Sequence, residues 1–155
     1  MIISRTSQYA IQALIYIATQ EQDQPILNRE IAARLNVPAP YLAKIMQSLC
    51  RGGLLNSFRG RLGGFTLRTD SSKINLMSVL RVTEGVEFTQ GCVLGLKLCS
   101  DETACPMHLR WTPIKQHIID LLHEQTLDKL ADAVLVGKYR LSDLHVFLPS
   151  ELTPS

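Results

Sequence analysis

Three of the chain's four cysteines lie with a histidine in one stretch of eighteen residues, GCVLGLKLCSDETACPMH. Six residues separate Cys92 from Cys99, five separate Cys99 from Cys105, and two separate Cys105 from His108. Thiolates and imidazoles are the protein groups that bind iron and zinc most readily. The spacing therefore predicts a metal site with Cys92, Cys99, Cys105 and His108 as its ligands.

The intervals between these residues bear on which metal they would bind. Structural zinc sites usually contain one or two CxxC pairs in short turns, which this stretch lacks. Wider intervals suit the larger perimeter of an iron-sulfur cluster, so the spacing favours a cluster and leaves zinc as the alternative. Cys50 lies far from the others in a periodic apolar segment, and we expect it to be a small buried hydrophobic residue.

Length and composition limit the kind of molecule in which this site can lie. The chain has 155 residues, of which 46% are hydrophobic, enough for one core but not for two full-sized domains. We find no signal-peptide pattern at the start and no apolar run of membrane-spanning length, so we expect a cytoplasmic protein without a membrane partner. Thiols stay reduced in the cytoplasm, which favours metal or redox roles over structural disulfides.

Charge is distributed unevenly along the chain. Residues 1–75 carry nine Lys or Arg against four Asp or Glu, while residues 76–155 carry seven against ten. The segment 31–69 has six basic residues and no acidic residue. A basic surface without carboxylates attracts polyanions, which predicts double-stranded DNA as a partner of the first half.

The periodicity of the basic half predicts a helix-turn-helix. Apolar residues recur at helical spacing over 7–19, over 29–35 with Asn28 as the N-cap, and from about residue 39 to the glycine pair at 52–53. Pro38 disfavours helical geometry in the residue before it, which places a turn between the second and third helices. The third helix has Tyr41 and Lys44 near its start.

A β-hairpin follows this pair of helices. Two short apolar strands, 54–58 and 65–67, flank a glycine-rich loop that contains Arg59 and Arg61. A helix-turn-helix followed at once by a basic hairpin is a winged helix. We therefore expect a mainly α fold with a small β-hairpin wing, and we expect Tyr41, Lys44, Arg59 and Arg61 to contact DNA.

The second half predicts a connecting loop and a long helix. A short apolar helix over 75–84 precedes the cysteine stretch, and a longer helix follows with Thr112 as N-cap and Pro113 at its first position. Apolar residues on this longer helix, Ile114, Ile118, Leu121 and Leu122, form a stripe that a second copy of the chain would cover in a homodimer. Packing of the same stripe on its own winged helix is the alternative.

Four segments follow from these patterns. They are a winged helix-turn-helix domain (1–85), a cysteine-rich loop (86–109), a dimerisation helix with a short helix after it (110–136), and a tail that we expect to lack regular structure (137–155).

The order of these parts, with the segment YLAKIMQSLCRGGLLNSFRGRLGGFTL, resembles the Rrf-type transcriptional regulators over about residues 1–135. The resemblance implies a homodimeric DNA-binding regulator whose cysteines hold a cluster, 2Fe-2S in preference to 4Fe-4S, with promoter binding controlled by the cluster's state. By resemblance, Cys92, Cys99 and Cys105 match the thiolate ligands, and His108 matches the histidine that completes the cluster in one branch of the family. Tyr41 and Lys44 match positions on the recognition helix, and Arg59 matches the wing position that enters the minor groove.

Two departures from that branch affect what the resemblance implies. The first cysteine interval is one residue longer, and Ala43 stands where the branch has a glutamate, which implies a different operator preference.

Other functions stay open at this point. A DNA-binding regulator with structural zinc, or with a thiol redox site that holds no metal, is the first alternative, and an iron-sulfur electron carrier is the second. We find no glycine-rich nucleotide loop and no paired catalytic carboxylates, so we expect neither an enzyme nor a small-molecule substrate.

Overall fold

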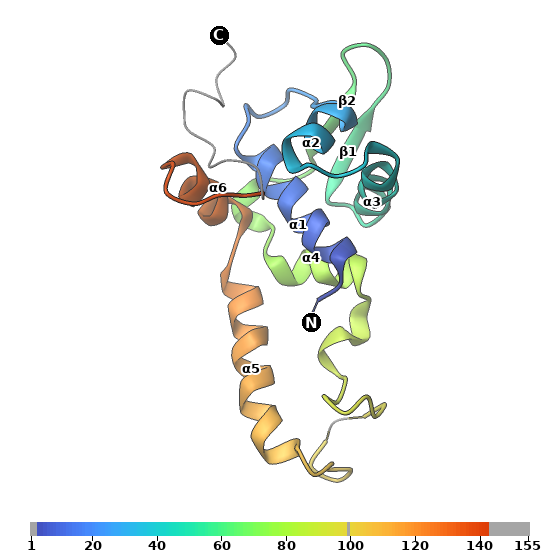
Figure 1. The fold of residues 1–155 in the computed structure, drawn as a ribbon, viewed down its shortest axis with the longest axis vertical. Helices are drawn as coiled ribbons and strands as arrows, with labels where there is room; N and C mark the ends of the chain where they lie inside the picture. Colours follow the sequence, from blue (N-terminus) through green and yellow to red (C-terminus); the bar gives the residue numbers. More distant parts are fainter. Residues whose placement is uncertain (1–2, 99, 143–155) are drawn as a thin grey trace.

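The computed structural model describes residues 3–98 and 100–142 (Figure 1). The described elements are helices with one antiparallel hairpin, in the order α1 (Arg5–Ala18), α2 (Asn28–Leu35), α3 (Ala39–Arg51), β1 (Leu55–Phe58), β2 (Gly64–Leu67), η1 (Ser71–Lys73), α4 (Leu76–Thr83), η2 (Val86–Thr89), α5 (His108–Glu124) and α6 (Leu127–Leu135). This arrangement confirms the predicted mainly α fold with a hairpin wing.

Helix α1 is the centre of the main core. It contacts α2, α3, α4 and α6, and its residues Ala10, Ala13 and Leu14 are fully buried. These positions recur at three- and four-residue intervals, so they lie on one side of the helix. The rest of the core comes from apolar residues of the surrounding helices, such as Leu42 and Met46 of α3.

The tight turn between α2 and α3 is made by Asn36, which adopts a left-handed conformation (φ 56°). Asparagine tolerates this conformation better than most residues, and it ends α2 here. The expectation that Asn28 caps α2 was wrong, because Asn28 is the first residue of the helix and Leu27 is the N-cap. The Asn28 amide instead donates a hydrogen bond to the Ala39 carbonyl (2.9 Å), which ties α2 to the start of α3.

The wing packs against the chain that links α1 to α2. Strands β1 and β2 pair from Leu55 with Leu67 to Phe58 with Gly64, and Ile26 forms an additional bridge to Phe65. A Cβ atom on Gly64 would lie 2.2 Å from the Ile26 carbonyl oxygen, and its φ is +128°. Only glycine allows this close approach, so the wing is held to the body of the domain at its base.

The chain then forms a lower lobe, which is clear in Figure 1. After α4 the described residues 86–98 and 100–107 form the descending part of this lobe, and α5 returns to the upper domain. The expected start of α5 was wrong: the helix begins at His108, and Pro113 lies inside it. Proline removes the hydrogen bond to the carbonyl of Leu109, a residue that is 86% exposed, so water can replace the missing donor. The Thr112 hydroxyl, expected to cap the helix, donates to the His108 carbonyl (2.7 Å).

Backbone hydrogen bonds close the lower lobe at its base. The Leu76 amide donates to the Gln125 carbonyl and the Leu127 amide donates to the Ile74 carbonyl, each at 2.9 Å. Helix α6 then packs on α1 and contributes to the main core. Within the described ranges, no helix has both the length and the apolar character needed to cross a membrane.

Candidate nucleic-acid interface and cysteine site

Two of the predicted metal ligands lie side by side. The Sγ atoms of Cys92 and Cys105 are 3.3 Å apart, although thirteen positions separate the two residues in the chain. Cys92 begins a tight turn in which the Gly95 amide donates to the Cys92 carbonyl, and Cys105 stands three residues before α5. Cys99, the third predicted ligand, lies outside the described residues.

The backbone around Cys92 favours the thiolate form of this residue. The Leu94 amide donates to its Sγ atom (3.4 Å), and this hydrogen bond is the largest of the effects that lower the pKa of the Cys92 thiol. The neighbouring Cys105 thiol and the charge of Lys115 on α5 act in the same direction, against the effect of burial. The thiolate is the form that binds metals and reacts with oxidants.

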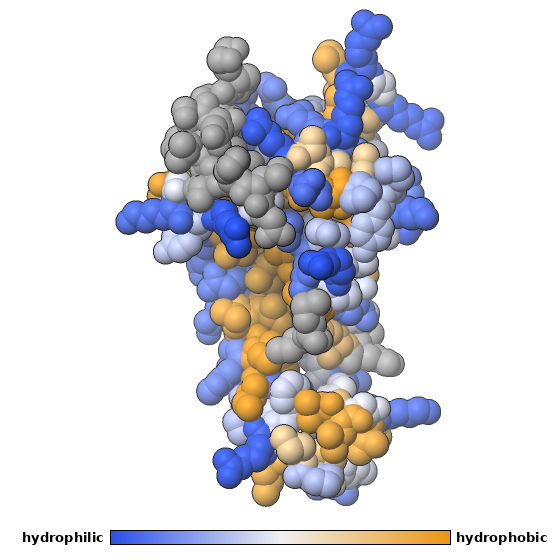
Figure 2. Space-filling model, in the orientation of Figure 1, coloured by the Kyte–Doolittle hydropathy of each residue, from blue (hydrophilic) through white to orange (hydrophobic). Residues whose placement is uncertain are grey.

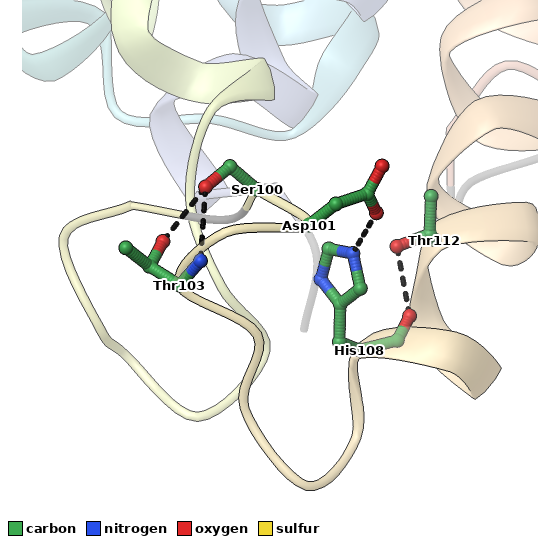
Figure 3. A network of polar contacts seen from close by, with 5 residues as sticks. All are labelled: Ser100, Asp101, Thr103, His108 and Thr112. Atoms are coloured by element: carbon green, nitrogen blue, oxygen red, sulfur yellow. Dashed lines mark hydrogen bonds and ion pairs between the residues drawn. The ribbon is translucent and has the colours of Figure 1, made fainter.

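His108 is buried at the start of α5, where it is 5% exposed. Its Nε2 atom lies 2.9 Å from Oδ1 of Asp101, which belongs to the loop between the second and third cysteines. Figure 3 shows this contact beside the Ser100–Thr103 hydrogen bonds that close the turn after Cys99. A carboxylate on one ring nitrogen fixes the plane and the tautomer of an imidazole, as in many metal sites.

The donor set, thiols with an imidazole, has the chemistry of ligands for an iron-sulfur cluster or for zinc, and the spacing of the two described thiols fits either. Two sulfur ligands of one tetrahedral metal ion lie about 3.7 Å apart when the metal-sulfur bonds are about 2.3 Å. Cys92 and Cys105 are near this separation. Within residues 3–98 and 100–142, no three His, Cys, Asp or Glu side chains converge as a metal-binding group. The described part of the loop therefore provides two adjacent thiols, Cys92 and Cys105. The imidazole of His108, three residues after Cys105, is oriented by Asp101.

Cys50 does not belong to this site. It lies on α3 and packs against the main core, where burial raises the pKa of its thiol. This agrees with its expected role as a small hydrophobic residue.

The expected DNA contacts are exposed on α3 and the wing. Lys44 faces solvent on α3, and Arg59 and Arg61 are exposed in the hairpin loop. Figure 2 shows hydrophilic side chains extending from the wing end of the molecule and apolar surface on the lower lobe. No acidic residue interrupts the segment that forms α3 and the wing.

Tyr41 is exposed at its edge (37%) but is held by the first turns of α1. Its hydroxyl is hydrogen-bonded to Thr6 (2.8 Å), and its ring meets Tyr9 edge-on, with ring centroids 5.8 Å apart. The guanidinium of Arg5 lies 5.7 Å from the centre of the Tyr9 ring. The start of α1 therefore adds polar and basic groups beside the recognition helix.

Sequence reasoning missed two sets of residues. Asp101 carried a signal, since it is an acidic residue inside the cysteine stretch. Thr6 and Tyr9 carried none, because contacts between α1 and α3 depend on how the two helices cross and not on their spacing in sequence.

Helix pair, turn and basic hairpin together define a winged helix-turn-helix regulator that binds DNA. The chain belongs to the Rrf2 family, since the model of that family, described as an iron-dependent transcriptional regulator, matches residues 3–133.

Named relatives agree with this assignment. The chain is 32% identical over 132 residues to an HTH-type transcriptional regulator of Aquifex aeolicus, covering 84% of this chain and 91% of the relative. It is 30% identical over 148 residues to the HTH-type transcriptional regulator IscR of Vibrio cholerae, covering 94% and 84%. The homologues are transcriptional regulators.

Solved structures show the same fold. CymR of B. subtilis, the global cysteine regulator of that organism, superposes with a TM-score of 0.70 at 27% identity, covering 84% of this chain and 96% of CymR. The oxidised form of Staphylococcus aureus CymR gives 0.67 at 28% identity, covering 85% and 97%. IscR of T. potens gives 0.65 at 28% identity, covering 84% and 87%.

Proposed function

We propose that this regulator is a homodimer whose binding to promoter DNA responds to an iron-sulfur cluster held by Cys92, Cys99, Cys105 and His108. The observation that carries the proposal is the 3.3 Å contact between the thiols of Cys92 and Cys105 at the start of α5. The two thiols bring Cys92 of the descending loop beside Cys105, three residues before α5, so a group bound by both would hold the loop to the start of the returning helix.

When bound, the cluster would supply a centre that changes with iron supply, oxidants or nitric oxide. The chain's own residues prepare the site. The Leu94 amide favours the thiolate of Cys92, and Asp101 orients the ring of His108. Because the loop and α5 lead to α4 and α6, a change in how they are held can reach the upper domain.

The DNA-binding part of the proposal is supported by the shape and charge of α3 and the wing. A recognition helix fits the major groove, where Tyr41 and Lys44 would meet base edges and phosphates. Arginines on a hairpin fit a narrow minor groove, which has the most negative potential. We assign Arg59 and Arg61 to this contact.

Dimerisation is supported by apolar side chains of α5 that are about half-exposed in the described chain. Ile114 and Leu121 are each 53% exposed, whereas Leu122 packs with Met77 and Leu80 of α4. One side of α5 therefore packs on its own subunit, and the other side is free for a second α5. Dimers of winged helices bind half-sites about 34–36 Å apart, which makes the spacing of the two subunits a control point for affinity.

The test is to purify the protein under anaerobic conditions, record its visible spectrum, and measure bound iron, sulfide and zinc. We expect a coloured protein that contains iron and sulfide in comparable amounts. Operator affinity would then be measured for cluster-loaded and iron-free protein at one salt concentration, with an operator selected by the protein from random double-stranded DNA. Zinc in place of iron and sulfide, or equal affinities, would contradict the proposal.

A second candidate, a thiol redox switch without metal, is favoured by the same contact between the Cys92 and Cys105 thiols. A disulfide between them would release two protons and two electrons, and hydrogen peroxide would accept both and become two molecules of water. The structural likeness to an oxidised form of S. aureus CymR supports testing this. Mass spectrometry of peroxide-treated, iron-free protein would show a loss of two hydrogens and a peptide joined through Cys92 and Cys105 if this candidate is correct.

A further inference from the structure

Glu84 joins the end of α4 to the first turn of α1. Its Oε1 atom accepts hydrogen bonds from the Ser4 amide (2.8 Å) and the Ser7 hydroxyl (2.5 Å). The Ser7 hydroxyl also contacts that of Thr83 (2.6 Å). Two consecutive residues at the end of α4 therefore hold the residues that begin α1, about eighty positions away in the chain.

The contact of Glu84 with Ser7 is partly buried, whereas its contact with Ser4 is exposed. Ser7 is fully buried, and Glu84 itself is half-buried at the C-terminal end of α4. Burial raises the pKa of Glu84, but the hydrogen bonds from Ser4 and Ser7 outweigh it and hold the pKa below its ordinary value. Glu84 is therefore a carboxylate at neutral pH, and the hydrogen bonds it accepts are charge-assisted.

The same turn of α1 holds the recognition helix. Thr6 lies between Ser4 and Ser7, and its hydroxyl is hydrogen-bonded to Tyr41 on α3 (2.8 Å). The amide of Ser7 donates to the Ser4 hydroxyl (3.1 Å), so the turn is closed on itself. A displacement of Ser4 or Ser7 would consequently move Thr6 and the Tyr41 side chain.

On the other side, Glu84 is next to the lower lobe. Gly85 follows in a left-handed conformation (φ 95°), and one short helical turn, η2, leads from it toward Cys92. Phe88 of this turn packs against the cluster of Met77 and Leu80 of α4 and Leu122 of α5. A series thus leads from the cysteine loop to the recognition helix: the chain runs from Cys92 back through η2 and Gly85 to Glu84, and hydrogen bonds continue from Glu84 to the first turn of α1 and from Thr6 to Tyr41.

We propose that Glu84 is a positioning residue that transmits the state of the cysteine loop to Tyr41 through the first turn of α1. This inference rests on the proposed function, in which the loop changes with the bound cluster. The coupling free energy limits this effect. Loss of the cluster can change DNA affinity only by the factor by which DNA binding favours one state of the loop over the other.

Two substitutions interrupt the series at different points. Glu84→Ala removes the acceptor of both hydrogen bonds, and Thr6→Val removes only the hydroxyl that holds Tyr41. Glu124→Gln, in an exposed carboxylate at the end of α5, is the control. Neither Glu84 nor Thr6 is a proposed ligand, so all of these proteins should bind as much iron and sulfide as the wild type.

The measured quantity is the ratio of operator affinities of cluster-loaded and iron-free protein. Allosteric coupling is typically about 5–150-fold, and we expect each interrupting variant to bring the ratio close to one while the control keeps the wild-type ratio. Glu84→Gln keeps an oxygen acceptor and should retain part of the ratio, which a general loss of folding would not produce. Wild-type ratios in both Glu84→Ala and Thr6→Val would overturn the inference.

A second measurement separates this inference from the proposed function. In iron-free protein, Glu84→Ala should increase hydrogen exchange at the amides of Ser7 and Gln8, which bind Ser4, and should shift the ring resonances of Tyr41. If wild-type protein bound the operator equally well with and without the cluster, the cluster response would be rejected. If the exchange and resonance changes were nevertheless present in Glu84→Ala, the structural link would still be supported. Unchanged exchange and resonances would reject the link itself.

Discussion

At the scale of single residues, each of the three cysteines in the loop should be needed for iron to bind. Cys92→Ser, Cys99→Ser and Cys105→Ser should each lower the iron content of anaerobically purified protein by at least about tenfold, because loss of even a supporting group around a metal costs that much. Cys50→Ser is the matched control, since Cys50 packs against the core and not beside the other thiols. Wild-type iron and sulfide content in Cys99→Ser would show that the third ligand is another residue.

The contact between Asp101 and His108 should slow the loss of the cluster. Asp101→Asn removes the charge that holds the imidazole, so a cluster should still assemble on the thiolates but be lost about tenfold faster in the presence of a chelator. The decay of visible absorbance measures this rate. Glu102→Gln, the same change at the next residue, should have no effect. Equal decay rates in all three proteins would mean that the Asp101–His108 contact does not stabilise the cluster.

At the scale of elements, the wing should contribute affinity through charge. Arg59→Ala should weaken operator binding and make the slope of log affinity against log salt shallower by about 0.9, because one arginine no longer neutralises the phosphates that flank the minor groove. A titration in several salt concentrations measures both quantities. Arg110→Ala removes an equally exposed arginine from α5 and should change neither. An unaltered slope in Arg59→Ala would place the wing away from DNA.

The link between α4 and α1 makes the folded state sensitive to acid. The pKa of Glu84 is lower in the folded chain than its ordinary value, so ionised Glu84 contributes stability above about pH 4.3 and loses it as the pH falls through the folded pKa. Wild type should exceed Glu84→Gln by about 1 kcal/mol in free energy of unfolding at pH 7, and the difference should shrink between pH 5 and pH 3. Urea denaturation at each pH measures it. A difference independent of pH would contradict the role of the charge.

The helices and the hairpin could be predicted from sequence because each has a local cause. Periodic apolar residues, Pro38 and the glycines around the wing act over a few positions. The start of α5 was missed because a proline at the first helical position is the usual pattern, whereas Pro113 is tolerated inside an exposed helix. That the cysteines and His108 bind a metal was predicted from residue chemistry and stays a prediction, while the 3.3 Å contact between the Cys92 and Cys105 thiols was found in the structure. The bonds of Glu84 to Ser4 and Ser7 were not predicted, since contacts between residues about eighty positions apart leave no pattern in one sequence.

At the scale of the whole molecule, the free side of α5 predicts the oligomeric state. The 17.3 kDa chain should sediment at about twice its mass, and Leu121→Glu should raise the dimer dissociation constant by more than about tenfold. Leu121 is half-exposed in the single chain, so the subunit itself should stay folded. Val136→Glu changes a similarly exposed apolar residue just after α6 and serves as the control. A dimer that persists in Leu121→Glu would move the interface elsewhere.

The hydrogen bonds between residues 74–76 and 125–127 have an evolutionary consequence. Because the lower lobe leaves the upper domain and rejoins it at one place, its two ends are fixed beside each other whatever lies between them. Such a segment can become longer or shorter, or change its metal ligands, without altering the upper domain to which its two ends are attached. Descendants of one ancestral DNA-binding domain could therefore acquire different signals by substitution within residues 86–107, while the signal still arrives through the same pair of helices.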